Sequence, residues 1–452
     1  MNQKSSLIIL CMASILVPFM GSAINLTLPQ IGNSFTMGME NMSWIAAIYL
    51  ISTAIFQVPF ARLGDIFGRK KIFVLGLIIF SISTIACGFS YNGTVLIVFR
   101  ALSGLGSAML FGTSMAILVS IFPLQQRGKA IGFNTASVYF ALSCGPFLGG
   151  LITQHLSWHW LFFIIGFLGI TVTIFAMLII KVEPADAKCS RFDYLGSLVY
   201  ALGLFGMIFG FTKLPSLLGF VFLGFGILFL AGFIFYELKI SAPVFDVRIF
   251  KSSRVFGLSC LSALINYAST SAVGFMMSLY LQYVRGLPPV SAGLFLIIQA
   301  IVQCVVSLFS GRLSDKINPS TLATLGMGII VAALIGMIFI ASETDMAIIV
   351  LLLVIMGLGF GIFASPNSNV IMSSVEKKFY GQASATLGTA RNAGQAISQG
   401  IATMTIALFV GNNEITRSLF PNFMRSFKLT FIICAILCIA GTYASSFRLK
   451  KQ

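Results

Sequence analysis

Fourteen long apolar runs divide this sequence and leave only short charged segments between them. Most runs are close to the ~20 residues that an α-helix needs to cross the hydrocarbon core of a bilayer. Soluble domains carry about 25% charged residues, whereas this chain has 9% charged and 58% hydrophobic residues. The pattern predicts an all-α polytopic membrane protein with fourteen transmembrane helices, over residues 6–28, 43–61, 71–89, 94–118, 128–153, 159–181, 194–212, 216–236, 255–283, 289–310, 319–341, 346–372, 381–410 and 429–447.

The distribution of Lys and Arg predicts the orientation of these helices. An even number of spans places both termini on one side, and 21 of the 28 basic residues fall in the segments on that side. Basic loops stay in the cytoplasm, so both termini are expected to be cytoplasmic, in the plasma membrane of a prokaryote. The net charge of +16 is spread over these loops. It therefore indicates contact with anionic lipid and not with nucleic acid.

Two features of the sequence could mislead. Residues 1–23 have the charge and apolar stretch of a signal peptide, but we interpret them as an uncleaved first span because more spans follow. His155 and His159 are four residues apart, but no carboxylate is near them in sequence, and the eight cysteines form no paired C-x-x-C motif. We expect no metal, no cofactor and no disulfide framework.

Short glycine patterns recur at nearly one offset along the chain. Residues 103–106 (SGLG) recur as 356–359 (MGLG), and Gly128 corresponds to Gly381, both at an offset of 253. Residues 62–65 (RLGD) recur as 312–315 (RLSD) at an offset of 250. The sequence therefore predicts an N-terminal six-helix bundle at 1–181 and a C-terminal one at 255–452. A linker with two inserted transmembrane helices is expected at 182–254.

A short charged hinge at residues 61–73 (ARLGDIFGRKKIF) joins the second and third runs. Gly64 and Gly68 permit a tight turn, and Asp65 sits among four basic residues. The stretch resembles the hairpin motif of the major facilitator superfamily, G-x-L-a-D-r-x-G-r-k. Matching positions are Leu63, Gly64, Asp65, Gly68, Arg69 and Lys70, while Ala61 and Ile66 depart from the motif.

The inserted pair and the connector at residues 242–250 resemble the fourteen-helix drug/proton antiporter branch of that superfamily. The resemblance implies two six-helix bundles with a substrate cavity between them. It also implies that the hinge residues Asp65, Arg69, Gly64 and Gly68, with Asp315 in the repeat, couple conformational change to transport.

Arg100 lies inside the fourth run, where a cation costs about 2.5–3.5 kcal/mol on insertion scales. Its repeat counterpart is the apolar Leu353, so the fold does not require the charge. The stretch resembles the superfamily motif R-x-x-q-G-x-g, whose arginine is linked with proton transfer, with Ser103 in place of glutamine. The alternative is an arginine that snorkels toward the nearby membrane interface.

The fifth run contains Gly145, Pro146, Gly149 and Gly150 at the spacing of the superfamily's antiporter motif, with Ala141 in place of one glycine. Residues 141, 145 and 149 share one helix face and permit close helix approach. Pro146 removes a backbone donor and bends the helix. The resemblance implies export, because the motif is generally absent from uptake carriers.

The first run resembles an exporter motif through Asn25, Leu28 and Pro29, but Met20 occupies the aspartate position. All twelve acidic residues lie in or beside loops, which argues against cationic substrates. Arg391 lies in the thirteenth run and could line the cavity together with Asn367 and Gln395. The alternative for Arg391 is capping by carbonyl groups of its neighbours.

The resemblance implies a secondary active exporter of small hydrophobic compounds that works by alternating access. No phosphate-binding G-x-x-x-x-G-K-[ST] loop is present, so an ion gradient is expected to drive transport. The resemblance to the drug/proton antiporter branch implies proton-coupled antiport. The alternatives are an uptake carrier or a lipid-type flippase on the same scaffold. No His, Cys or carboxylate constellation within the runs suggests an enzyme. The expected partners are a small-molecule substrate, a coupling ion and membrane lipids, and we expect a monomer.

Overall fold

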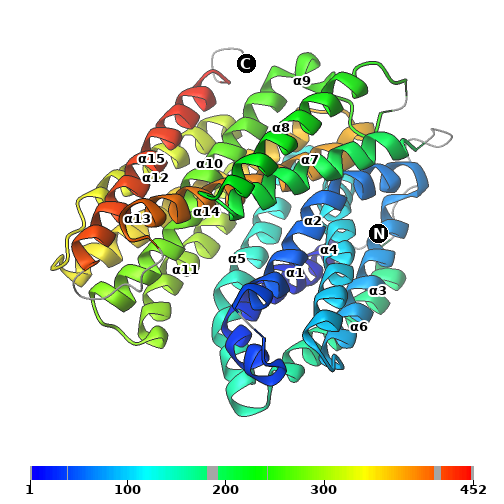
Figure 1. Ribbon diagram of the computed structural model, residues 1–452. Coiled ribbons are helices and arrows are strands. Elements are labelled where there is room, and N and C mark those ends of the chain that lie inside the picture. The colour runs from blue at the N-terminus through cyan, green and yellow to red at the C-terminus, as the bar shows by residue number, and fades with distance from the viewer. Residues whose placement is uncertain (1–2, 38, 181–191, 242, 412–418, 449–452) are drawn as a thin grey trace. The chain divides into compact units, whose positions relative to one another are not determined.

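A computed structural model describes residues 3–37, 39–180, 192–241, 243–411 and 419–448. Long α-helices dominate these residues (Figure 1). The first six are α1 (Gln3–Phe35), α2 (Met39–Phe67), α3 (Arg69–Gly88), α4 (Gly93–Ile121), α5 (Leu124–His155) and α6 (Trp158–Ile179). The inserted pair is α7 (Tyr194–Thr212) and α8 (Leu217–Glu237), and a short α9 (Ile249–Ser252) follows it.

The second half of the chain repeats this run of long helices. It contains α10 (Arg254–Leu279), which continues as the π-helical η1 (Tyr280–Val284), then α11 (Pro289–Leu313), α12 (Pro319–Ile338), α13 (Met346–Ser373), the 3₁₀ turn η2 (Lys377–Phe379), α14 (Tyr380–Phe409) and α15 (Phe420–Ser446). All fourteen predicted runs are thus helical. Thirteen of the described helices are long and apolar enough to cross a membrane. The remaining one, α14, contains Arg391 and several amide side chains.

Local signals in the sequence explain where several helices begin. The side chain of Asn92 accepts a hydrogen bond from Val95 N at the start of α4, and Ser253 does the same for Phe256 N at the start of α10. Such caps satisfy amide groups that a helix N-terminus leaves open. Gly68 separates α2 from α3 with a φ of +109°, a conformation that favours glycine.

The described helices cluster into two units. One contains residues Met1–Ala201, Phe235–Val247 and Val375–Thr389, and the other contains Leu202–Ile234, Arg248–Ser374 and Ala390–Gln452. The chain passes from one unit to the other within α7, α8 and α14. In the first unit, α1 packs along α5, α2 and α3 both pack along α4, and α3 also packs along α6.

The second unit reproduces three of these pairings with the second half of the chain. Helices α11 and α12 both pack along α13, and α12 also packs along α15. Glycines make the repeated close contacts. A Cβ on Gly106 would lie 2.8 Å from Gly76 O, and a Cβ on Gly359 would lie 2.9 Å from Gly326 O. The recurring sequence pattern therefore encodes the same backbone-to-backbone contact twice.

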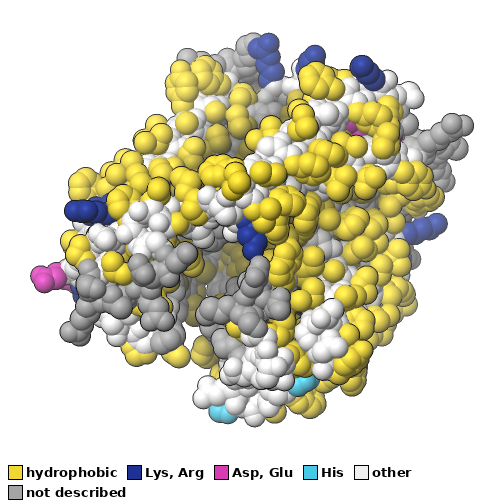
Figure 2. All heavy atoms as spheres, in the orientation of Figure 1, with side chains coloured by type: hydrophobic (Ala, Val, Ile, Leu, Met, Phe, Trp, Pro, Cys, Tyr) yellow, Lys and Arg dark blue, Asp and Glu magenta, His cyan; other side chains and the backbone are white. Residues whose placement is uncertain are grey.

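Large hydrophobic side chains cover much of the outer surface, as Figure 2 shows for one face. On α8 alone, Leu217, Phe220, Val221, Leu228 and Phe235 are exposed. A soluble protein rarely exposes so continuous an apolar surface. The helices are therefore suited to contact lipid.

Candidate functional site

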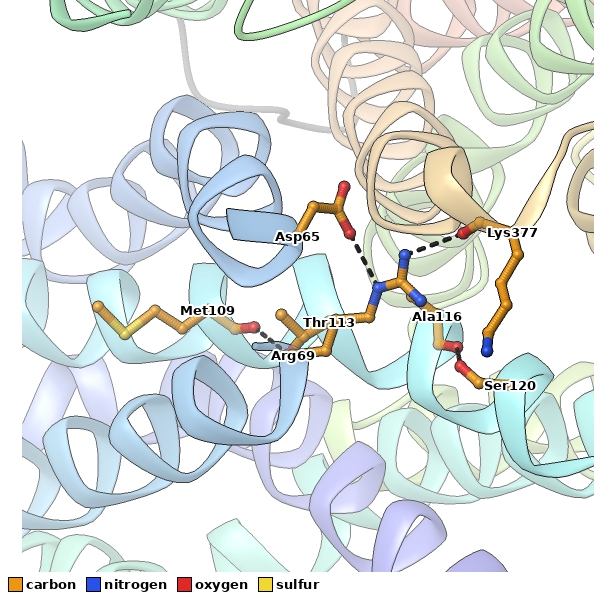
Figure 3. Close-up of polar contacts among 7 residues, drawn as sticks. All are labelled: Asp65, Arg69, Met109, Thr113, Ala116, Ser120 and Lys377. Carbon is orange, nitrogen blue, oxygen red and sulfur yellow. Dashed lines mark hydrogen bonds and ion pairs between the residues drawn. The ribbon is translucent and has the colours of Figure 1, made fainter. Parts of the chain in front are cut away.

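The hinge between α2 and α3 places an acid and a base in direct contact. Asp65 lies in the last turn of α2 and is fully buried, and Arg69 opens α3 and is 6% exposed. Arg69 Nε donates a hydrogen bond of 2.9 Å to Asp65 Oδ1 (Figure 3). The acid and the base of the hinge therefore form an ion pair. Because both groups are charged and buried, this contact is stronger than a surface ion pair.

The two hinge glycines have different roles. Gly68 forms the turn itself, through its positive φ. Gly64 lies within α2, where a Cβ would be 3.0 Å from Thr113 Cγ2 of α4. Thr113 is fixed in turn by a hydrogen bond of 2.7 Å to Met109 O (Figure 3). Gly64 therefore allows close approach to α4, and only Gly68 makes the tight turn.

A distant part of the chain completes this site. We call residues Val375–Thr389, which cluster with the first unit, the lead segment of α14. Arg69 Nη2 donates a hydrogen bond of 3.0 Å to Lys377 O (Figure 3). Two guanidinium groups face the ring of Tyr380. The ring centroid is 5.9 Å from Arg69 Cζ and 5.2 Å from Arg127 Cζ. Cations are attracted to the face of an aromatic ring, so Tyr380 adds to the attachment.

Asp65 also lies against the first turn of α14. A Cβ on Gly381 would be only 2.5 Å from both carboxylate oxygens of Asp65. Glycine is therefore required for the carboxylate to come this close to the backbone. The N-terminus of a helix carries partial positive charge, which stabilises a carboxylate at this place.

The rest of the lead segment is held by other helices of the same unit. Ser384 Oγ donates to Phe111 O of α4 over 3.0 Å, and the hydroxyl groups of Thr389 and Tyr200 are 2.8 Å apart. Gly388 faces the side chain of Gln57 so closely that a Cβ there would collide with it. Contacts with α2, α3, α4 and α7 thus fix about the first three turns of α14.

The repeated hinge lies in the second unit and differs in burial. Asp315 follows α11 in a turn and is partly exposed, and its backbone N–H donates to Arg312 O over 3.3 Å. Asn369 Nδ2 donates to Ser314 Oγ over 3.2 Å beside it. The two hinges therefore share a sequence pattern but not the burial of the aspartate.

Helix α5 presents its small residues to α1. A Cβ on Gly149 would lie 2.7 Å from Ala23 Cβ, and a Cβ on Gly145 would be 3.2 Å from Phe19 O and would collide with Ser22 Oγ. Pro146 lies between them inside the helix. Gly150 is partly exposed. The predicted close helix approach is thus present between α5 and α1.

Arg100 is buried inside the first unit, with 1% of its surface exposed. Its Nε donates to Ile45 O over 3.0 Å, and its guanidinium carbon lies 4.2 Å from the centre of the Tyr49 ring. Among the described residues, neither Nη1 nor Nη2 has a hydrogen-bond acceptor. The arginine does not snorkel to the surface, because these atoms are inaccessible to solvent.

The other candidate cavity residues are divided between the two units. Met20 is fully buried in α1. Asn25 belongs to α1 too, but its side chain lies outside the described residues. Arg391 and Gln395 are partly exposed on α14, in the second unit.

Asn367 takes part in a cluster that the sequence did not predict. Arg448 Nη1 donates to Asn367 Oδ1 over 2.7 Å and to Ser259 Oγ over 2.9 Å. Arg448 Nη2 donates to Ser445 Oγ, and Nε donates to Ser445 O. Burial lowers the pKa of Arg448 to about 10, so the group remains charged at neutral pH. Arg448 therefore joins α10, α13 and the end of α15 through neutral acceptors.

These residues offer charge and hydrogen bonds. Within the described ranges, no three His, Cys, Asp or Glu side chains gather as a metal site would require. Three histidines or carboxylates are the usual minimum for a catalytic zinc.

Comparison with known proteins places these observations in a family. Residues 10–399 match the profile of the Major Facilitator Superfamily. The riboflavin transporter RibZ of Clostridioides difficile (strain 630) is 28% identical, over 98% of this chain and 97% of RibZ. The tetracenomycin C resistance and export protein of Streptomyces glaucescens is 26% identical, over 85% of this chain and 72% of that protein.

A solved structure has the same fold. The crystal structure of the human organic anion transporter MFSD10 matches with a TM-score of 0.72, covers 98% of this chain and 100% of that one, and is 12% identical. At 12% identity the match shows only that the two chains share a fold.

Proposed function

This chain belongs to the Major Facilitator Superfamily and is therefore a multi-pass membrane transporter and not an enzyme, and we propose that it exports small hydrophobic compounds. Transport proceeds by alternating access, in which one six-helix bundle moves against the other around a substrate site. The chain acts as a monomer in the plasma membrane with both termini in the cytoplasm. It exchanges its substrate for protons.

The contact between α5 and α1 carries this proposal. Gly145 and Gly149 let α5 approach the backbone of α1, and Pro146 lies inside the helix between them. General helix packing explains the glycines but does not require a proline within the same two turns. Residues 141–150 match the spacing found in exporters of the superfamily, and the contact shows that this face is packed and not exposed to lipid.

The hinge site supports alternating access. Asp65 and Arg69 hold the lead segment of α14, and the rest of α14 belongs to the other unit. Release of the lead segment therefore frees a helix that continues into the second bundle. Contacts that form in one state and break in another are what a two-state carrier needs.

The charges of the candidate cavity residues favour neutral or anionic substrates. Arg100 is buried without acceptors for its Nη atoms among the described residues, and Met20 stands where the exporter motif has an aspartate. An unpaired organic cation beside a buried guanidinium would be repelled in a medium of low dielectric constant.

The riboflavin transporter among the relatives favours a second candidate function. In this alternative, the chain carries a planar heteroaromatic metabolite, and the concentration gradient of that metabolite sets the direction of transport. A cavity that prefers neutral or anionic substrates could also accept such a metabolite. The two candidate functions therefore differ in the direction of transport and in its coupling to an ion.

A transport assay in proteoliposomes tests the proposal. The purified full-length protein is reconstituted, and matched cationic, neutral and anionic compounds, including riboflavin, are offered with and without an imposed pH gradient. Proton-driven movement of neutral or anionic compounds supports the proposal. Transport of riboflavin alone, with no response to the pH gradient, supports the second candidate and contradicts antiport.

A further inference from the structure

A pair of carboxyl groups lies at one end of the inserted helix pair, within the first unit. Glu237 is the last residue of α8, and only 1% of its surface is exposed. Asp193 precedes α7, and its Oδ1 accepts a hydrogen bond of 2.9 Å from Gly196 N in the first turn of that helix. Both residues belong to the first unit. The hairpin of α7 and α8 therefore brings together two acids that are 44 residues apart in the sequence.

Gly196 allows the two carboxyl groups to meet. A Cβ on Gly196 would lie 2.6 Å from Glu237 Oε1 and would also collide with Asp193 Oδ2. Both oxygens are thus turned toward the same small space above the glycine. Any other residue at this position would force the carboxyl groups apart.

Few groups compensate these charges. The hydroxyl of Tyr236 donates to Asp193 Oδ1 over 3.3 Å. The positive charge of Arg62, near the end of α2, attracts the Glu237 carboxylate. The backbone amides of Val244 and Phe245 face Glu237. Among the described residues, however, neither Oε of Glu237 nor Oδ2 of Asp193 accepts a hydrogen bond of normal geometry.

We propose that Asp193 and Glu237 form a proton-binding site that holds one proton between the two carboxyl groups. Two neighbouring carboxylates whose facing oxygens are shielded from water repel each other, so binding one proton relieves the repulsion. The bound proton also supplies a hydroxyl donor for an oxygen that otherwise has none. No metal is needed, because two carboxyl groups and a tyrosine give too few ligands for a divalent cation.

The site connects the inserted helices to the hinge through Arg62. With the proton bound, the pair and Arg62 carry one negative and one positive charge. When the proton leaves, the pair carries two negative charges and attracts Arg62 more strongly. The inserted helices thereby acquire a charge-dependent contact with the α2 end that also carries Asp65. This inference does not depend on the direction of transport or on the substrate.

Infrared difference spectroscopy of the purified full-length protein tests the proposal. A pH titration should show the band of a protonated carboxyl group that persists at neutral pH and is lost in Glu237→Gln. In Asp193→Asn, which keeps the helix cap, the band should fade at a pH lower by about one unit or more, because a neighbouring negative charge has been removed. In Arg62→Gln the band should persist to higher pH.

Two further variants make the result specific. Glu343 is an exposed acid in the described turn before α13, and Glu343→Gln should leave the band unchanged. Gly196→Ala separates the carboxyl groups without removing either, and the band should fade at lower pH than in the native chain. A titration that is identical in the native chain, Glu237→Gln and Asp193→Asn overturns the proposal, whatever the transport assays show.

Discussion

The Nη2 atom of Arg69 donates a 3.0 Å hydrogen bond to the carbonyl oxygen of Lys377, which lies 308 residues further along the chain. The same guanidinium binds Asp65 through Nε. Asp65 therefore orients an arginine that reaches the start of α14. A backbone carbonyl as acceptor means that the contact depends on the position of the lead segment and not on the side chain at residue 377.

Asp65→Asn should reduce transport strongly while folded protein remains in the membrane. The change removes the charge that holds Arg69 and that faces the first turn of α14. A hydrogen bond to a charged group contributes about 1.5–3 kcal/mol, so a loss of about tenfold or more in rate is expected. The measurement is initial transport rate per folded transporter in proteoliposomes.

The matched control for this prediction lies beside the same segment. Glu376 forms an ion pair of 2.7 Å with Lys378, but the two side chains are 71% and 56% exposed. Exposed pairs contribute little, so Glu376→Gln should transport at the native rate. If Asp65→Asn and Glu376→Gln are equally active, the role given to the hinge is wrong.

Replacing glycine in α5 should affect transport through the contact with α1. Gly149→Leu, or the smaller change Gly149→Ala, pushes a side chain into Ala23. Pro146→Ala should straighten the helix and change its movement. Loss of export with normal expression is expected for Gly145→Leu, Gly149→Leu and Pro146→Ala.

Cysteine accessibility along α5 measures the proposed change in packing. Gly328 in α12 has no atom within 4 Å of its Cβ position, so Gly328→Ala is a control that should leave transport intact. Unaltered accessibility across α5 in all three α5 variants would contradict the packing argument. A transport defect in Gly328→Ala would show that the effect is not specific to α5.

Arg448→Lys should lower the thermal stability of the protein. Lysine keeps the charge but cannot form the forked set of bonds to Ser259, Asn367 and Ser445. The loss of one or two hydrogen bonds from a buried charged group corresponds to about 2–4 kcal/mol. Thermal unfolding in detergent measures the shift. Arg425→Lys, at an exposed position of α15, is the control, and equal stability of the two variants would contradict the role of Arg448.

The helices could be predicted from the sequence because each one must satisfy its own backbone inside a membrane. A polar backbone group without a partner is costly in lipid, so long apolar runs become helices whatever surrounds them. Even α14 was predicted, although it contains Arg391 and several amide side chains. The paired glycines Gly106 and Gly359 also revealed the repeat, because close backbone contact requires glycine.

The long-range parts of the sites were not predictable in the same way. Asp65 and Arg69 are four residues apart on consecutive helices, so their contact follows from local geometry. Lys377 accepts the Arg69 hydrogen bond through its backbone carbonyl, and such an acceptor leaves no trace in the sequence. From the sequence, Arg448 was interpreted as one of the basic residues that set the orientation of the helices in the membrane. The proximity of Asp193 and Glu237 depends on how α7 and α8 fold back on each other.

The last prediction concerns the charge of the substrate. Met20 is fully buried in α1, and its position corresponds to an aspartate in the exporter motif. Met20→Asp should add recognition of lipophilic cations such as ethidium, because a carboxylate in a low-dielectric site attracts an organic cation that the native residue does not. Met20→Asn is the control, since it has nearly the shape of aspartate without the charge.

Transport in proteoliposomes with an imposed pH gradient decides this prediction. The native protein and Met20→Asn should move neutral or anionic compounds and leave ethidium behind, whereas Met20→Asp should export ethidium and respond more strongly to pH. The difference should appear in the ratio of cation to anion transport, which does not depend on how much protein is reconstituted. Strong, pH-driven export of ethidium by the native protein would show that a carboxylate at position 20 is not the determinant of substrate charge. In that case the negative charge for the cation must come from another part of the chain, and among the described residues Asp65 and Glu237 are the buried acids.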